Sequence, residues 1–261
     1  MELYTIFGNP VSHSKSPLIH NSVFQKYAPN KRFTKTLLID GSKLREVYQQ
    51  LRISGASVTV PHKEIAYKVC DEVRGIAKKI GAVNCIVTEK GKLVGYNTDV
   101  YGFLDSISEW SDIEKVLIIG AGGTARALTI GFLERDWDIT IVNRSEKRLE
   151  NFREFPIKLY SWKDFEIANY DLVVNVTSAG LNDDSLPMDR EVLEKVFQNS
   201  RYAVDVIYKD TPFLQLAKEI GLKVKDGSMM LIYQGVLANQ LFTNNQIEKE
   251  KILKAMLEVY E

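Results

Sequence analysis

The sequence has little of what marks secreted, metal-binding or nucleic-acid-binding proteins. Its 261 residues include two cysteines, Cys70 and Cys85, which are too few for a disulfide framework and lack metal-ligand spacing. Both lie in apolar segments, so we expect buried free thiols and no metal site. Lysine plus arginine and aspartate plus glutamate each total 34, so no net field would draw the chain to nucleic acid or to an anionic membrane.

Long hydrophobic runs are also missing. No stretch approaches the roughly 20 apolar residues that a membrane span requires. The N-terminal segment carries an early acid, Glu2, and its apolar run is too short for a signal peptide. We therefore expect a cytoplasmic protein that binds neither membrane nor nucleic acid.

What the sequence does contain is an alternation of short apolar strands and amphipathic helices, over a length that favours two domains. In the first third we expect strands at 3–8, 36–39 and 57–60, a hairpin from 82–88 and 93–97, and helices at 17–27, after an N-cap at Ser42, and at 64–73. Further on we expect strands at 115–119, 139–142, 157–160, 172–176, 203–207 and 223–225, with helices at 124–134, 145–152, 191–197 and 212–220. Such alternation predicts an α/β fold with a parallel, doubly wound sheet. Two final helical patterns, 229–242 and 247–260, could pack on either domain.

A glycine-rich turn follows the strand at 115–119 and opens the next helix. It reads Gly120-Ala-Gly-Gly-Thr-Ala-Arg126-Ala. Gly120 permits a tight turn, Gly122 lets the backbone approach a pyrophosphate, and Ala125 keeps helix and strand close. Because N–H groups at a helix start bind phosphate, this context predicts a dinucleotide site. Its backbone contacts are expected from Gly120, Ala121, Gly122, Gly123, Thr124 and Ala125.

The end of the next strand favours NADP over NAD. NAD enzymes place an acid about 20 residues after the turn, where it binds the ribose 2′-hydroxyl. This chain has Asn-Arg-Ser-Glu-Lys-Arg at 143–148. Arg144 and Arg148 can clamp a 2′-phosphate, whereas Glu146 suits the dipole of a helix start. The simpler interpretation, that both arginines only solvate a helix end, stays open.

Polar side chains gather beside strand ends in the first third of the chain. Ser14 and Ser16 precede a helix, where Ser16 as N-cap and Pro17 at N1 would explain only one of the hydroxyls. Together with the neighbouring lysine and histidine, these serines suit a carboxylate equally well. The cluster therefore has two open interpretations, a helix cap and an anion site.

Four further polar residues could carry chemistry. Thr59 and Lys63 lie at and just past a strand end, Asn84 interrupts an apolar run, and Asp99 ends the hairpin. A buried amide needs hydrogen-bond partners, and a Lys–Asp pair can handle protons. A solvated lysine and an aspartate N-cap are the plain alternatives, because spacing alone does not show that Lys63 and Asp99 meet.

Taken together, these segments resemble the shikimate dehydrogenase family over nearly the whole chain. The motifs that carry the resemblance are Phe7-Gly-Asn-Pro10, Ser12-His-Ser-Lys-Ser-Pro17-Leu-Ile-His20-Asn, Val58-Thr-Val-Pro-His-Lys63, Gly81-Ala-Val-Asn84, Gly95-Tyr-Asn-Thr-Asp99, Gly120-Ala-Gly-Gly-Thr-Ala-Arg126, Asn143-Arg-Ser145, Asn175-Val-Thr-Ser-Ala-Gly180, Asp210-Thr-Pro-Phe213, and Asp226-Gly227 through Gln234. So many motifs in one order leave little room for coincidence.

The resemblance implies reversible, NADPH-dependent reduction of 3-dehydroshikimate to shikimate, a step of aromatic amino-acid biosynthesis. It implies that Ser14 and Ser16 bind the substrate carboxylate, with Tyr208 nearby. The residues implied around the ring hydroxyls are Thr59, Lys63, Asn84, Asp99 and Gln234. Those implied at NADP, besides the glycine-rich turn, are Asn143, Arg144, Ser145, Arg148, Val206 and Gly227. It also implies a Rossmann-type NADP domain at 101–227, inserted into a substrate domain formed by 1–100 and 228–261.

Four positions depart from the family's usual pattern. Ser57 stands where the family has Asn, His62 where it has Phe, Met229 where it has Gly and Gly235 where it has Ala. We expect looser substrate packing at Ser57, an altered pH profile from His62 beside Lys63, and a differently shaped nicotinamide pocket near Met229 and Gly235.

The implied chemistry is hydride transfer between NADPH and the C3 carbonyl carbon. Lys63 is expected to act as proton donor and Asp99 to orient it, although a coupled pair can share these roles. One alternative is a relative that accepts quinate or prefers NAD. Another is a non-catalytic dinucleotide sensor, which would be expected to have lost Lys63 or Asp99. Monomer and homodimer are both open.

Overall fold

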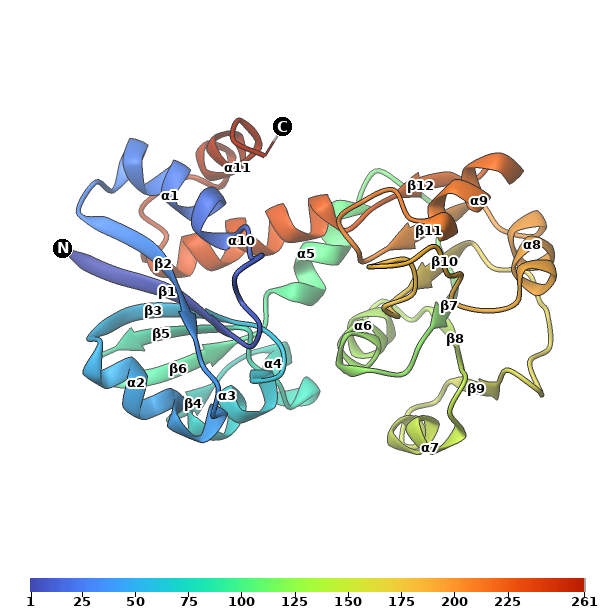
Figure 1. The fold of residues 1–261 in the computed structure, drawn as a ribbon, viewed down its shortest axis with the longest axis horizontal. Helices are drawn as coiled ribbons and strands as arrows, with labels where there is room; N and C mark the ends of the chain where they lie inside the picture. Colours follow the sequence, from blue (N-terminus) through green and yellow to red (C-terminus); the bar gives the residue numbers. More distant parts are fainter. Residues whose placement is uncertain (261) are drawn as a thin grey trace. The chain divides into compact units, whose positions relative to one another are not determined.

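The computed structural model describes residues 1–260, which fall into two compact units (Figure 1). The first unit contains residues 1–105 and the described chain from Leu231 onward, and the second is Ser106–Met230. Both combine helices with a sheet, so the predicted α/β class is confirmed. Within the described chain, no helix combines the length and the apolar character needed to cross a membrane.

The first unit is built on a six-stranded mixed sheet. Its strands are β1 (Glu2–Gly8), β2 (Lys31–Leu37), β3 (Ile53–Val58), β4 (Glu72–Val73), β5 (Cys85–Glu89) and β6 (Lys92–Tyr96), in the order β2-β1-β3-β5-β6-β4. β5 pairs antiparallel with β3 and with β6, whereas the other pairs are parallel. The predicted β5–β6 hairpin is therefore confirmed.

Helices cover both faces of this sheet. Because successive strand residues point to opposite faces, Tyr4 and Ile6 pack against α1 (Ser16–Tyr27) and α10 (Ser228–Phe242). Phe7 points the other way, and the core on that face receives side chains from α2 (Leu44–Gln50), α3 (Lys63–Val69) and α4 (Ile76–Ile80). A last helix, α11 (Lys249–Leu257), packs on α1 and α10. Burial on two faces explains the nearly continuous apolar character of β1.

Three expected elements of this unit have different bounds. β2 begins at Lys31 and ends at Leu37 rather than spanning 36–39, and its charged residues suit an edge strand. β3 is Ile53–Val58 rather than 57–60. The helix expected at 64–73 ends at Val69, because the backbone N–H of Asp71 bonds to the carbonyl of Leu93 and the chain joins the sheet as β4.

Two expected helix caps were also wrong. Ser16 is the first residue of α1, whose N-cap is Lys15, and the Ser16 N–H donates to Ser14 Oγ at 3.2 Å. Asp40, not Ser42, is the capping residue of a 3₁₀ turn, Gly41–Lys43, which precedes α2. The Asp40 carboxylate accepts the Ser42 N–H at 2.9 Å, and a charged acceptor makes the stronger cap.

The second unit has a six-stranded sheet in which every strand pair is parallel. Its strands are β7 (Lys115–Ile119), β8 (Asp138–Asn143), β9 (Lys158–Ser161), β10 (Leu172–Asn175), β11 (Tyr202–Asp205) and β12 (Lys223–Lys225), in the order β12-β11-β10-β7-β8-β9. Its helices are α6 (Gly123–Leu133), α7 (Glu146–Leu149), α8 (Arg190–Gln198) and α9 (Pro212–Ile220). Along the chain, strands are added outward from β7 to β9 on one side and then outward from β10 to β12 on the other. This reversal of direction confirms the predicted doubly wound sheet. Ligands of such sheets bind at the carboxyl ends beside this reversal point.

Candidate active site

Lys63 and Asp99 meet at the carboxyl-terminal side of the first unit's central strands. Lys63 begins α3, and Asp99 begins α5 (Asp99–Ser106). The Lys63 Nζ donates to Asp99 Oδ2 at 2.6 Å, with side-chain exposures of 29% and 18%. The plain interpretation of Lys63 as a solvated lysine is therefore wrong, and a partly buried ion pair replaces it.

Asn84 orients the other oxygen of the same carboxylate. Its Nδ2 donates to Asp99 Oδ1 at 2.8 Å and to Thr98 Oγ1 at 2.9 Å, and its Oδ1 accepts the Thr98 N–H at 2.8 Å. The Asn84 backbone bonds to Val58 and Tyr96, so the amide is fixed between β3 and β6. Both Asp99 oxygens are thus engaged, which fixes the direction in which Lys63 presents its remaining N–H groups.

Gln234 reaches this cluster from α10. The Thr98 hydroxyl donates to Gln234 Oε1 at 3.5 Å, and Gln234 Nε2 donates to the Leu231 carbonyl at 2.8 Å. Helices α5 and α10 lie side by side (Figure 1) because Gly102 has no side chain: a Cβ there would lie 2.6 Å from the Gln234 backbone nitrogen. A residue far along the sequence is thereby brought next to Asn84 and Asp99.

The two serines expected at the substrate carboxylate form a separate pair. Ser14 Oγ and Ser16 Oγ lie 3.2 Å apart, with Ser16 buried and Ser14 half-buried. Thr59 is half-buried just after β3, and its N–H donates to the Phe7 carbonyl at 2.9 Å. Within residues 1–260, no hydrogen bond joins these three side chains to the Lys63–Asp99 pair. Their expected role at a carboxylate stays a prediction.

The glycine-rich turn of the second unit has the geometry of an open phosphate cradle. Gly120 follows β7 with φ +115°, a conformation that favours glycine, and its N–H donates to the Val142 carbonyl at 2.9 Å. A Cβ added at Gly122 or Gly123 would meet no atom within 4 Å. No side chain caps α6 at this end. The start of α6 therefore has open space beside its glycines and no capping side chain, which leaves room for a pyrophosphate at the helix N-terminus.

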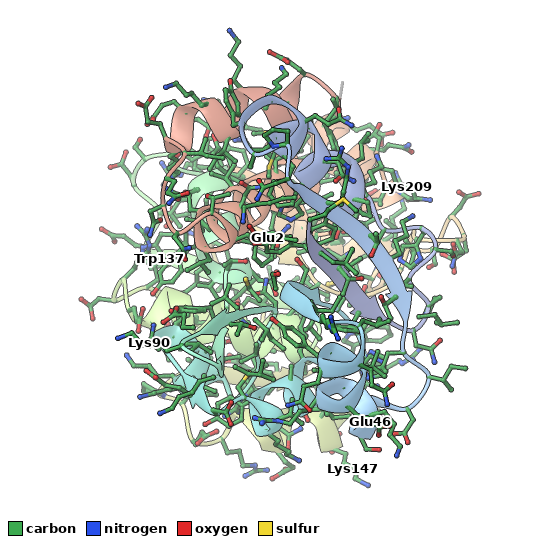
Figure 2. The ribbon with its side chains drawn as sticks, turned by 90° about the vertical axis from the view of Figure 1, so that its left-hand side faces the viewer. Glu2, Glu46, Lys90, Trp137, Lys147 and Lys209 are labelled. Atoms are coloured by element: carbon green, nitrogen blue, oxygen red, sulfur yellow. The ribbon has the colours of Figure 1, made fainter. Side chains whose placement is uncertain are left out.

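At the end of β8 lies the Arg144 guanidinium, which has no carboxylate partner in the described chain. Asn143 is buried and donates from Nδ2 to the Ser145 carbonyl at 2.9 Å, whereas Arg144, Ser145 and Arg148 are exposed. Lys147, on the same segment, projects away from the ribbon (Figure 2). No carboxylate of the described chain forms a salt bridge with Arg144. The site thus offers positive charge without an internal partner, which suits a phosphate monoester.

The remaining expected residues also lie in the second unit. A Cβ at Gly227 would lie 2.2 Å from the Val206 carbonyl oxygen and 2.9 Å from Tyr208 Cδ1, so these three residues adjoin. Tyr208 itself is 49% exposed, in the segment after β11. The roles expected for them, contact with NADP for Val206 and Gly227 and with the carboxylate for Tyr208, stay predictions.

Residues 6–86 match the model of the shikimate dehydrogenase substrate binding domain. Over 98% of this chain and 94% of the relative, the sequence is 42% identical to the shikimate dehydrogenase (NADP(+)) of Helicobacter hepaticus. The chain belongs to the shikimate dehydrogenase family. The shikimate dehydrogenase structure from Aquifex aeolicus superposes with a TM-score of 0.89 at 31% identity, covering 98% of this chain and 97% of that one. The structure from Thermus thermophilus, in complex with NADP(H) and shikimate, has a TM-score of 0.86 at 30% identity, covering 99% and 100%.

Two departures from the usual shikimate dehydrogenase pattern have structural roles. His62 is 2% exposed, and its Nε2 lies 2.6 Å from the Leu38 carbonyl, so it links the start of α3 to the segment after β2. Gly235 was expected to reshape the nicotinamide pocket, but a Cβ there would lie 2.8 Å from Ile19 Cδ1. Gly235 therefore serves the packing of α10 on α1, and its expected effect on the nicotinamide pocket stays a prediction.

Thr98 is a site residue for which the sequence predicted no role, although it lies within the motif Gly95-Tyr-Asn-Thr-Asp99. Its hydroxyl and N–H connect Asn84 with Gln234. The sequence contained a signal for this role, because Thr98 directly precedes Asp99. Its side chain could therefore be expected near the Asp99 carboxylate.

Proposed function

We propose that the chain catalyses the reversible, NADPH-dependent reduction of 3-dehydroshikimate to shikimate. Membership of the shikimate dehydrogenase family supports this function, and the observation that carries it is the Lys63–Asp99 pair held by Asn84. A non-catalytic sensor has no need for a lysine ammonium presented by a carboxylate whose two oxygens are both engaged. A cytoplasmic location and a monomer or homodimer belong to the same proposal.

Lys63 acts on the C3 oxygen of the substrate. NADPH supplies the hydride when it is bound, and the ketone oxygen then gains negative charge. An ammonium beside that oxygen stabilises the charge and donates a proton to it. One Lys63 N–H is held by Asp99 at 2.6 Å, which leaves the others for the substrate. Asp99 keeps the lysine in place, and a proton from solvent, which reaches the part-exposed Lys63 side chain, returns the amine to the charged state.

The other residues position the ring and the cofactor. Ser14 and Ser16 hold the substrate carboxylate, and Tyr208 is a further residue expected to bind the substrate. Thr59, Asn84 and Gln234 surround the ring hydroxyls. The two N–H groups of the Asn84 amide donate to Asp99 and Thr98, so Asn84 contributes through its acceptor oxygen. This clamp lowers the barrier by holding the C3 carbon in one orientation.

NADP is held by the open glycine-rich turn and by the end of β8. The N–H groups of the turn, Gly120–Ala125, would hold the pyrophosphate. Arg144 and Arg148, with Asn143 and Ser145, would hold the 2′-phosphate. Val206 and Gly227 would complete the cofactor site. The open space above Gly122 and the absence of a salt bridge to Arg144 in the described chain support this placement.

The test is reduction of NADP⁺ by shikimate, followed by absorbance. We expect turnover with shikimate, and Lys63→Ala to lower kcat by roughly a hundredfold or more with little change in KM, since removal of a proton-transfer group costs this much. Lys68→Ala is the matched control, because Lys68 is an exposed lysine in the last turn of the same helix. A Lys63→Ala variant with near-normal kcat would remove Lys63 from the chemistry. Turnover with quinate but not shikimate would reject the substrate, and a preference for NAD⁺ would reject the cofactor.

A further inference from the structure

We propose that Trp162 is a specificity-determining residue for NADP, which supports the Arg144 guanidinium where a 2′-phosphate would bind. This inference rests on the proposed function and extends it to a residue that no motif singled out. Arg144 Cζ lies 6.0 Å from the centre of the Trp162 ring.

Strand register brings these two residues together. β8 and β9 are parallel, and Asn143 is paired with Ser161 at their carboxyl ends. Arg144 and Trp162 are the first residues after the two strands, so they follow the last paired residues at matching positions. Side chains at matching positions of parallel strands point to the same side. The neighbourhood of arginine and indole is therefore set by the sheet and not by a mobile loop.

A tight turn fixes the position of the indole. The Asp164 N–H donates to the Ser161 carbonyl at 3.2 Å, and the Ser161 hydroxyl donates to the Asp164 carboxylate at 2.5 Å. Trp162 lies inside this turn and is 41% exposed. The part-exposed indole thus has one face beside the Arg144 guanidinium.

The indole restricts an arginine that has no other partner. Within residues 1–260 the Arg144 guanidinium forms no salt bridge, and the Trp162 ring is the contact that the structure gives it. The electron-rich face of an indole attracts a guanidinium, and its flat surface limits the rotamers of the arginine. A side chain ordered before the ligand arrives loses less entropy on binding. Trp162 therefore favours the ligand that Arg144 contacts.

This arrangement predicts discrimination between two cofactors that differ by one group. NAD⁺ and NADP⁺ share their adenine, ribose and pyrophosphate, and only NADP⁺ carries the 2′-phosphate. If Trp162 acts through Arg144, its loss weakens NADP⁺ binding and leaves NAD⁺ binding nearly unchanged. If Trp162 instead stacked on the adenine, both affinities would fall by the same factor. The two arrangements are thus separable by binding alone.

The experiment measures the dissociation constants of NADP⁺ and NAD⁺ by calorimetry for the full chain and for Trp162→Leu and Trp162→Phe. We expect Trp162→Leu to raise the Kd of NADP⁺ about threefold to fivefold, which corresponds to about 0.6 to 1 kcal/mol. Trp162→Phe keeps an aromatic face, so its Kd for NADP⁺ is expected to lie between that of the unchanged chain and that of Trp162→Leu. In an Arg144→Ala background, Trp162→Leu is expected to have no further effect on NADP⁺.

The matched control is Trp137→Phe. Trp137 (labelled in Figure 2) also lies 6.0 Å from an arginine Cζ, that of Arg135, but it precedes β8 and so stands at the opposite end of that strand from Arg144. We expect this variant to keep both affinities. Intrinsic fluorescence gives a second readout, because the change in emission on adding NADP⁺ should be lost in Trp162→Phe and kept in Trp137→Phe.

Three results would overturn the inference. If Trp162→Leu leaves the ratio of the two Kd values unchanged, the role of Trp162 is rejected and the proposed cofactor stands. The same conclusion follows if the effects of Trp162→Leu and Arg144→Ala on NADP⁺ binding are additive. A wild-type chain that binds NADP⁺ no better than NAD⁺ rejects the proposed cofactor as well.

Discussion

His20 lies within the aromatic core of the first unit, stacked on Phe33 with 4.4 Å between ring centroids. Its Nδ1 is 3.2 Å from Asn239 Nδ2, and its Nε2 has no hydrogen-bond partner. Burial lowers the pKa of His20 to about 3. The folded protein therefore keeps this imidazole neutral, whereas the unfolded chain protonates it near its ordinary pKa of about 6.5. Stability from the neutral ring is complete above that pH and is lost as the pH falls toward 3.

Replacing this histidine should make the fold less sensitive to acid. Between pH 7 and pH 5, His20 should lower the free energy of unfolding by about 2 kcal/mol, because each pH unit below the unfolded pKa costs about 1.4 kcal/mol. In His20→Phe this part of the decrease should vanish, although the variant starts from lower stability because Asn239 loses a partner. Urea unfolding of both proteins at pH 7 and pH 5 measures the two decreases in unfolding free energy. The carboxylates, which both proteins share, contribute equally and cancel when the two decreases are compared. Equal decreases in the two proteins would contradict the predicted coupling.

At the scale of elements, a buried network joins the end of β11 to the start of α9. Asp205 is fully buried and accepts hydrogen bonds from Thr211 Oγ1 at 2.7 Å, Asn175 Nδ2 at 2.9 Å and the Ile207 N–H at 3.0 Å. Burial nevertheless raises the pKa of this carboxyl. Thr211 is also the N-cap of α9, where its hydroxyl accepts the Leu214 N–H. One hydroxyl thus satisfies both a carboxylate and a helix end.

Thr211→Val should lower the free energy of unfolding by about 2 kcal/mol. Valine keeps the shape of threonine but leaves Asp205 short of one donor and α9 without its cap, and each loss costs on the order of 1 kcal/mol. Thr211→Ser keeps the hydroxyl and should lose clearly less. Chemical denaturation of the three proteins gives the comparison. If valine and serine were equally tolerated, the hydroxyl would not be what holds this helix end.

The sequence identified most elements and misjudged those whose ends depend on distant partners. Strong periodicity predicted β7, α6 and α9 to within one residue and the β5–β6 hairpin to within three. β2 was misplaced because an edge strand carries charged residues and has only Phe33 buried. The helix at 64–73 was drawn too long because the pairing of Asp71 with Leu93 is invisible in local sequence. Local patterns thus predict interiors better than boundaries.

At the scale of the whole molecule, the motifs predicted which residues to examine but not how they meet. Lys63, Asn84 and Asp99 were singled out, yet their hydrogen bonds depend on the packing of β3, β6 and α5. Trp162 was missed because nothing local marks it. Only the pairing of Asn143 with Ser161 across two strands places it beside an arginine. Contacts that arise from strand register cannot be inferred from one segment.

The second unit should fold by itself. One of its core clusters is formed by residues within Ser106–Met230, including Leu117, Val173 and Phe213. We expect a fragment of residues 106–230 to unfold in a single cooperative transition, and NADP⁺ to raise its midpoint, since a ligand of the folded state stabilises it. Circular dichroism during thermal unfolding measures both effects. A fragment without a cooperative transition would show that this core needs the rest of the chain.

The first unit is closed by residues from both ends of the chain, and this sets an order of events on the ribosome. Tyr4 packs on Phe242 and donates its hydroxyl to the Phe242 carbonyl at 3.0 Å. At a synthesis rate of about 5–20 residues per second, β1 waits roughly 10 to 50 seconds for that partner, which lies 238 residues further along the chain. During this interval the second unit can complete itself, whereas the face of the first sheet that α1 and α10 share is covered by α1 alone. The nascent chain is therefore most vulnerable to aggregation, and most dependent on chaperones, before its last helices leave the exit tunnel.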